Sequence, residues 1–241
     1  KNTTGSSNTA LGMNSLMYNL SGNYNIAVGT MTLLNNTTGY HNIAMGFQTM
    51  LNNTIGNWNI AVGSGNLKFN TTGNYNTAVG FGSMISNTSG FYNTGIGTGS
   101  LSANLTGVGN TGLGMWALVS STTGDNNVSV GYASSFYNTT GKENTVVGTQ
   151  SLYANTTGSK NTTLGFRTLY VNITGSQNTV LGSEAGNTVT TGSNLTIIGY
   201  NAQPSSIDAV NQVTIGNNFV TSIRSNVTSL TSLSDMRDKR N

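Results

Sequence analysis

Glycine recurs every 17 residues along this chain without a single insertion or deletion. One series of glycines begins at Gly12 and ends at Gly216, and a second begins at Gly5 and ends at Gly192. Self-similarity at one fixed period is the signature of a repeat architecture, in which identical units stack on one another. The predicted turn glycines include Gly12, Gly29, Gly46, Gly63 and Gly80 in the first series and Gly22, Gly39, Gly56 and Gly73 in the second.

Each repeat is predicted to form one coil of an all-β parallel β-roll, or β-solenoid. The two glycines of a repeat indicate two turns, at positions that need a positive φ or a close approach of another segment. Two short strand-like runs lie between them, one such as residues 25–29 and one centred on a leucine such as Leu33. Helix is disfavoured because Gly, Asn and Thr are poor helix formers and no 3.6-residue period appears. At a strand spacing of about 4.8 Å, about 13 coils would form a rod of roughly 60 Å.

Two neighbouring columns of the repeat suggest how the coil is oriented. In the coils from Gly12 to Gly114, the residue two places before each glycine of the first series is small, as in Ala27 and Ala44, and the next residue is aliphatic, as in Val28 and Met45. Adjacent strand residues point to opposite faces. We therefore expect the aliphatic column to fill the interior and the alanine column to form an outer stripe. Such a stripe favours close packing against other copies, and we predict a homotrimer, either intertwined or side by side.

The composition excludes several classes of protein. Charged residues make up 6% of the chain and apolar residues 35%, with one proline and no cysteine, which favours a thin continuous core over disorder. The net charge of +3 is not clustered, so no nucleic-acid partner is expected. No apolar run is long enough to span a membrane, so no membrane insertion is expected. We expect a structural protein, not an enzyme, with no metal site and no cofactor.

The regular pattern fades near Pro204, and the composition changes again near Ser234. We predict β-roll repeats over 1–203, an irregular last coil and connector over 204–233, and the start of another domain over 234–241. The last segment is rich in charge after a nearly uncharged rod.

One column of the repeat carries aromatic rings in five successive coils. This column, which we call the first aromatic ladder, consists of Tyr24, His41, Trp58, Tyr75 and Tyr92. Two interpretations remain open: the rings stabilise the rod by packing on one another, or they form a strip that contacts a host glycan. A threonine column that includes Thr38 and Thr72 raises a third hypothesis, an ice-binding solenoid.

The repeat resembles the β-roll heads of trimeric autotransporter adhesins. Those heads carry a related N-S-V-A-I-G pattern, matched here by residues 25–29 (NIAVG) and their copies over about residues 1–216. The period of 17 departs from the shorter repeat of that family. The resemblance implies a trimeric parallel β-roll at a cell or virion surface.

The C-terminal residues 233–241 (LSDMRDKRN) resemble the opening of the intramolecular chaperone domain of endosialidase-type phage tailspikes. That domain folds fibre chains into trimers and often cleaves itself off at its own start. By this resemblance Ser234 would be the nucleophile and the bond from Ser234 to Asp235 the scissile one. A serine nucleophile needs a base, which in the family lies further downstream, so cleavage is expected only where a downstream domain exists.

Together these patterns favour a phage tail fibre at the virion surface that supports host attachment. Its expected partners are two further copies of the chain, other fibre or tail proteins, and a host surface glycan. The alternatives are a bacterial trimeric adhesin or surface filament at the cell surface and, less favoured, the ice-binding solenoid.

Overall fold

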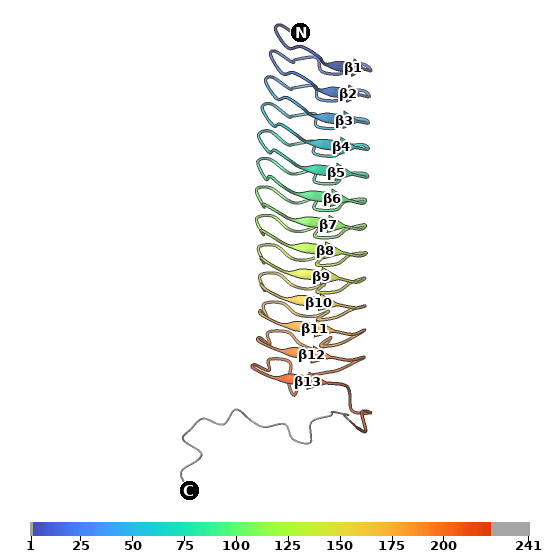
Figure 1. The fold of residues 1–241 in the computed structure, drawn as a ribbon, viewed down its shortest axis with the longest axis vertical. Helices are drawn as coiled ribbons and strands as arrows, with labels where there is room; N and C mark the ends of the chain where they lie inside the picture. Colours follow the sequence, from blue (N-terminus) through green and yellow to red (C-terminus); the bar gives the residue numbers. More distant parts are fainter. Residues whose placement is uncertain (1, 223–241) are drawn as a thin grey trace, which may run out of the picture.

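The computed structural model describes residues 2–222, which wind into one long parallel β-solenoid (Figure 1). Thirteen short strands stack in sequence order in a single parallel sheet, and the described residues contain no helix. The all-β prediction, the parallel roll and the coil of 17 residues are confirmed.

Every strand is three residues long and occupies the same place in its coil. The strands are β1 (Thr9–Leu11), β2 (Ile26–Val28), β3 (Ile43–Met45), β4 (Ile60–Val62), β5 (Thr77–Val79), β6 (Thr94–Ile96), β7 (Thr111–Leu113), β8 (Val128–Val130), β9 (Thr145–Val147), β10 (Thr162–Leu164), β11 (Thr179–Leu181), β12 (Thr196–Ile198) and β13 (Val213–Ile215).

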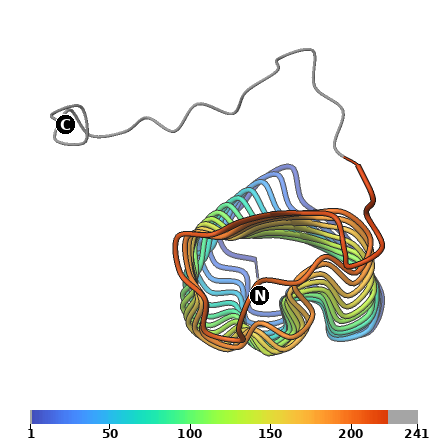
Figure 2. The same ribbon diagram turned by 90° about the horizontal axis from the view of Figure 1, so that it is seen from below.

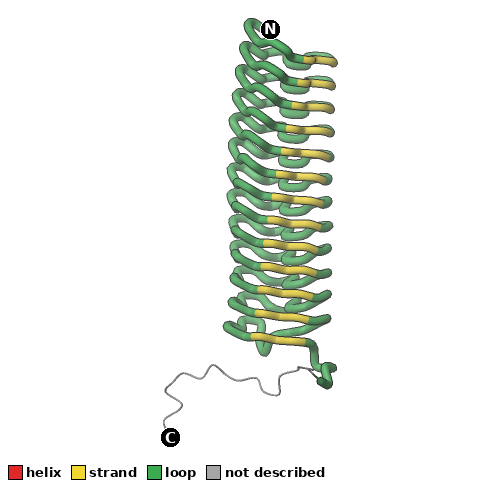
Figure 3. Tube along the Cα trace, in the orientation of Figure 1, coloured by secondary structure: helices red, strands yellow, loops and turns green. Residues whose placement is uncertain are grey.

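The strands pair in strict register. Ala27 lies beside Ala44, and each further strand residue lies beside the residue 17 positions later, up to the pairing of β12 with β13. The register therefore continues through the coil that contains Pro204. The strands form one side of the rod, and turns form the remainder of each coil (Figure 3).

The prediction of a second strand-like run around the leucine column was wrong. Leu33 and Leu67 lie in turns and adopt left-handed backbone conformations with φ of 49°. This conformation is unfavourable for a leucine in isolation. It reverses the direction of the chain and brings each leucine back under the sheet, where it is fully buried. Each coil therefore has one strand and a compact turn that supplies the core residue.

The predicted orientation of the strands was also wrong. Ala44 is 0% exposed and points into the coil, whereas Met45 is 42% exposed and points outward. Figure 2 shows the backbone of each coil around a narrow interior, where in the first coils the leucine column and the alanine column form one buried cluster. The alanine column is therefore part of the core, and the aliphatic column forms the outer surface of the sheet.

Side-chain sizes compensate across this thin core. In the first coils a small alanine faces a large leucine or methionine, as Ala61 and Leu67 do within one buried cluster. Near the C-terminal end the relation is inverted. Ile197 occupies the strand position, and Gly186 occupies the position of the leucine column. A Cβ atom added at Gly186 would lie 3.0 Å from Cδ1 of Ile197, so the larger strand residue needs the glycine.

A polar coil divides the core. Ser129 in β8 and Ser135 in the leucine column replace the apolar residues found elsewhere. The Ser129 hydroxyl lies 2.7 Å from Oγ of Ser134 and 3.1 Å from Oγ of Ser135. One apolar cluster precedes this coil and a second follows it. The hydrogen bonds satisfy the buried hydroxyls, but the coil contributes little apolar burial.

The two glycine columns serve different purposes. Glycines of the first column have strongly positive φ, for example 130° at Gly46, a region that side chains rarely adopt. Glycines of the second column are needed for space. A Cβ atom at Gly39 would lie 2.3 Å from Oδ1 of Asn36 and 2.6 Å from the carbonyl oxygen of Gly56. Both predicted reasons for glycine, positive φ and close approach, are confirmed, one in each column.

Buried asparagines just before each strand form the first ladder of hydrogen bonds. Asn42 donates from its backbone N–H and from its side-chain amide to Oδ1 of Asn25 one coil earlier, at 3.0 and 3.1 Å. The same amide also donates to the carbonyl oxygen of Gly56 at 2.8 Å. The pattern repeats along the rod and ends where the backbone N–H of Leu195 donates to Asn178.

A second asparagine ladder runs along the turn that precedes the second glycine column. Asn53 donates to Oδ1 of Asn36 at 2.8 Å and to the carbonyl oxygen of Gly56 at 3.0 Å. This ladder is interrupted at Ser121, whose hydroxyl has no partner among the described residues. Oδ1 of Asn104, one coil earlier, is left without a donor for the same reason.

Restoring this ladder should stabilise the rod. We predict that Ser121→Asn raises the free energy of unfolding by about 1–3 kcal/mol, since a buried acceptor regains its donor and each new hydrogen bond contributes about 1 kcal/mol. The reverse change Asn53→Ser in an intact part of the ladder should lower it by a similar amount. Equilibrium unfolding in denaturant measures both; a destabilised Ser121→Asn chain would contradict the proposed cause of the interruption.

Candidate functional site

The first aromatic ladder forms a continuous stack on the surface. The ring centroids of Tyr24 and His41 are 4.8 Å apart, those of His41 and Trp58 4.0 Å, those of Trp58 and Tyr75 6.4 Å, and those of Tyr75 and Tyr92 5.1 Å. The interplanar angles lie between 5° and 26°. The structure therefore brings together all five residues predicted for this column.

The backbone explains why the rings align. Every member of the ladder lies at a corner with φ between 54° and 58°, just before the buried asparagine that begins the strand. Identical corners in successive coils direct the side chains the same way, about one strand spacing apart. The flat faces of the inner rings cover one another. Glycan contact by the first aromatic ladder stays a prediction. Because the inner ring faces are covered, a glycan has access only to the ring edges and to the outer faces of the first and last rings.

A shallow groove runs between this ladder and the outer face of the sheet. Its volume is about 310 Å³, and its walls are aromatic on one side and aliphatic on the other. The lining residues are Tyr24, Ile26, His41, Ile43, Trp58 and Ile60.

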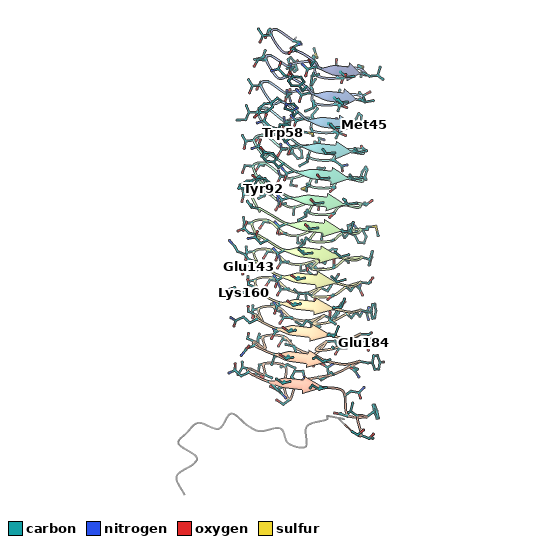
Figure 4. The ribbon with its side chains drawn as sticks, viewed as in Figure 1. Met45, Trp58, Tyr92, Glu143, Lys160 and Glu184 are labelled. Atoms are coloured by element: carbon teal, nitrogen blue, oxygen red, sulfur yellow. The ribbon has the colours of Figure 1, made fainter. Side chains whose placement is uncertain are left out.

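Beyond Tyr92 the same column loses its aromatic character. Its later members include Gly109, Asn126, Glu143 and Lys160. Figure 4 places Trp58, Tyr92, Glu143 and Lys160 along one side of the rod, opposite Met45 and Glu184. This side therefore changes from aromatic to polar near the middle of the rod.

A second aromatic cluster lies in later coils and was missed by the sequence analysis. Its centre is a column of three rings, Phe136, Tyr153 and Tyr170, with centroid separations of 5.2 and 5.1 Å. Trp116 and Tyr137 contact this column edge to face. The signal was present, because the three central rings recur at the 17-residue period.

A cation completes the second cluster. The guanidinium of Arg167 lies 5.1 Å from the ring centroids of both Phe166 and Tyr170, within the range of a cation–π interaction. Its Nε donates to Oε1 of Gln150 at 2.8 Å. Burial raises the pKa of the Tyr153 phenol above its ordinary value of 10.0, and the neighbouring Tyr137 adds to the shift.

Another groove on the rod has a volume of about 680 Å³. Threonines line one wall, and their hydroxyls are engaged by the backbone: Thr54 donates to the carbonyl oxygen of Thr71 at 2.9 Å, and Thr71 to that of Thr88 at 3.0 Å. The wall therefore presents methyl groups. The complete lining consists of Asn35, Asn52, Thr54, Phe69, Thr71, Ser86, Thr88 and Leu105.

The remaining predicted sites belong to the threonine column and to the C-terminal segment. Thr38 and Thr72 of the hypothetical ice-binding column lie exposed in turns and not on the sheet. Ser234 and Asp235 lie outside the described residues. Within residues 2–222, no group of three or more His, Cys, Asp or Glu side chains is arranged to hold a metal ion. No helix in that range could span a membrane.

Comparison of the chain with protein families, curated proteins and solved structures finds no match.

The raised pKa of Tyr153 predicts how stability changes at alkaline pH. A phenol whose pKa is higher in the folded state contributes stability below its unfolded pKa of about 10, and this contribution is lost as the pH rises through the folded pKa. We expect Tyr153→Phe to reduce the fall in thermal unfolding midpoint between pH 9 and pH 11.

A matched ring change, Tyr75→Phe in the first aromatic ladder, serves as the control for removing a phenol elsewhere. Equal alkaline sensitivity in the wild type and in Tyr153→Phe would show that Tyr153 does not titrate abnormally.

Proposed function

We propose that the chain is a structural shaft segment of a homotrimeric fibre of the viral tail-fibre type, which supports host attachment at the virion surface. Its role is mechanical: to hold the attachment surfaces at a distance and in a fixed orientation. The proposal is carried by the outer face of the sheet, together with the two resemblances noted in the sequence.

The outer face of the sheet carries no charge, and it consists of an aliphatic column of third strand residues beside a column of first strand residues that are isoleucine, valine or threonine. The third residue of every strand points outward and is half-buried or exposed. A contiguous exposed apolar surface of this length is unusual for a soluble monomer and marks an interaction site. Its members are Leu11, Val28, Met45, Val62, Val79, Ile96, Leu113, Val130, Val147, Leu164, Leu181, Ile198 and Ile215.

This face and its flanks together suit a stable interface between copies. Thirteen coils at about 4.8 Å give a length of roughly 60 Å. A three-residue strand spans about 10 Å, so the sheet face offers roughly 600 Å² on each copy. The residues that flank the face have to contribute as well to reach the ~800 Å² per partner that stable complexes bury. A second copy of the chain offers an equally long, equally uncharged face with the same periodicity.

Three copies are favoured because apolar residues flank the face on both sides. Ile26 and Ile60 lie on the side where the strands begin, and Phe47 and Phe81 lie where the strands end. In a closed three-fold arrangement each copy contacts one neighbour through each flank. The resemblance to trimeric autotransporter heads supports the same number.

Light scattering tests the assembly. We expect the wild-type chain to have three times the mass of one chain. Adding two charges to the outer face with Val62→Lys and Val79→Lys should dissociate it into monomers, because charges buried at an interface without partners cost several kcal/mol.

The matched control places the same charges on exposed turns, with Thr72→Lys and Thr106→Lys, and should keep the assembled mass. A wild-type chain that is monomeric at micromolar concentration, or a charged-face variant that still assembles, would refute the proposed role of this face.

A further inference from the structure

The first aromatic ladder ends at Tyr92 with one ring face uncovered. Tyr75 covers the opposite face, and the next position of the column is Gly109, which has no side chain. Tyr92 is 58% exposed, compared with 50% for Tyr75 inside the stack. A flat aromatic face is therefore open toward the next coil.

The missing side chain at Gly109 is not required by the backbone. Gly109 has φ of 68°, close to the 56° at which Asn126 occupies the same corner one coil later. Other residues of this column, such as Tyr75, also adopt this conformation. Glycine here leaves an open slot beside the Tyr92 ring, about one strand spacing high.

The far wall of the slot carries a free hydrogen-bonding group. A Cβ atom at Gly109 would lie 2.6 Å from Oδ1 of Asn126, so the Asn126 side chain leans into the slot. Asn126 is exposed; within residues 2–222 its backbone N–H donates to the carbonyl oxygen of Val108 at 2.8 Å, and its side-chain amide makes no hydrogen bond. An amide offers both two donors and an acceptor.

Asp125 and Lys142 beside the slot are paired with each other, and the carboxylate of Glu143 lies one coil beyond Asn126 in the same column. Oδ1 of Asp125 accepts the backbone N–H of Val108 at 3.0 Å, and Oδ2 lies 2.6 Å from Nζ of Lys142. The free polar group of the slot is thus the neutral amide of Asn126. This arrangement favours a ligand that is flat and apolar on one side, carries hydroxyl groups at its edge and has no net charge.

We propose that the slot formed by Tyr92, Gly109 and Asn126 binds one neutral pyranose ring of a surface saccharide. The C–H face of the sugar packs on the free face of Tyr92 at about 3.5–4.0 Å. A hydroxyl group of the sugar hydrogen-bonds to the Asn126 amide. The inference deepens the proposed function, because it supplies the fibre with a ligand, but the slot lies within a single chain and does not require assembly.

Packing gives one reason for glycine at this position, because an added Cβ atom would lie 2.6 Å from Oδ1 of the Asn126 side chain, which would have to move. A further ring or amide at residue 109 would extend the ladder and reduce the conformational entropy lost on folding, whereas glycine maximises that loss. The column carries larger residues on both sides of the gap. An open slot that admits a ligand also accounts for the gap.

Saturation-transfer NMR tests the slot directly. The probes are methyl β-D-glucopyranoside, methyl β-D-galactopyranoside and N-acetylglucosamine. We expect the wild-type chain to transfer saturation to the ring C–H protons of at least one of them. Tyr92→Ala removes the platform, and Gly109→Asn fills the slot with a residue that this column already accommodates; each should weaken binding by roughly tenfold or more.

Two controls separate the slot from effects on the fold. Tyr92→Phe keeps the ring face and should keep binding. Gly82→Asn makes the same glycine change at a positive-φ position with nothing within 4 Å of the added Cβ, and should also keep binding. No saturation transfer to any of the three probes, or binding that survives both Tyr92→Ala and Gly109→Asn, would overturn the proposal.

Failure of the saccharide proposal can be distinguished from failure of the proposed assembly. Saturation transfer to the saccharide is measured on the wild type and on the variant that combines Val62→Lys and Val79→Lys. These two changes disrupt the outer sheet face and leave the slot unchanged. Binding by both supports a site within one chain. Binding that requires assembly would contradict the site as described.

Discussion

The rod depends on hydrogen bonds between side chains 17 residues apart. In both ladders an asparagine amide bridges its own coil to a neighbouring one, as Asn53 does between Asn36 and Gly56. These bonds hold the chain in turns where many residues that are not glycine, including Leu33, adopt left-handed conformations. A single coil would leave buried amides without partners, so each coil is stable only between neighbours, as expected for a solenoid. Because the bonds require exact stacking, any insertion within a coil should be costly.

This constraint fixes the inside of the coil and leaves the outside free to vary. The interior columns hold asparagines, small residues and leucines. Where a larger residue replaces a small one, a neighbouring position is smaller, as Gly186 is beside Ile197. Outer columns change character along the rod, from the rings that end at Tyr92 to the charges at Glu143 and Lys160. The proposed functions therefore lie on these outer columns: the aliphatic column of the sheet is proposed for assembly, and local breaks such as Gly109 are proposed for ligands.

Much of this fold could be predicted from the sequence, because the period, the parallel stacking and the first aromatic ladder follow directly from residue spacing. The direction in which strand residues point could not. Alternation shows that Ala44 and Met45 face opposite ways, but not which one faces inward, and the usual preference for burying the larger residue gave the wrong answer. The deciding fact is three-dimensional: a turn returns the leucine column beneath the sheet, where it packs against the middle residue of each strand and makes that residue part of the core. The cluster around Tyr153 was missed because only its three central rings share one column.

Methionine oxidation tests the central claim, that the aliphatic sheet face is buried between copies while the alanine side of the same strands is buried within each copy. Met45 on the sheet face and Met17 on a turn are both 42% exposed in the single chain, and Met50 in the interior is 0% exposed. Mass spectrometry after mild peroxide treatment reports sulfoxide formation at each site. In the assembled protein, Met17 should oxidise while Met45 and Met50 are protected; after dissociation, Met45 should oxidise as fast as Met17 and Met50 should stay protected. Oxidation of Met45 at the rate of Met17 in the assembled protein would contradict the account.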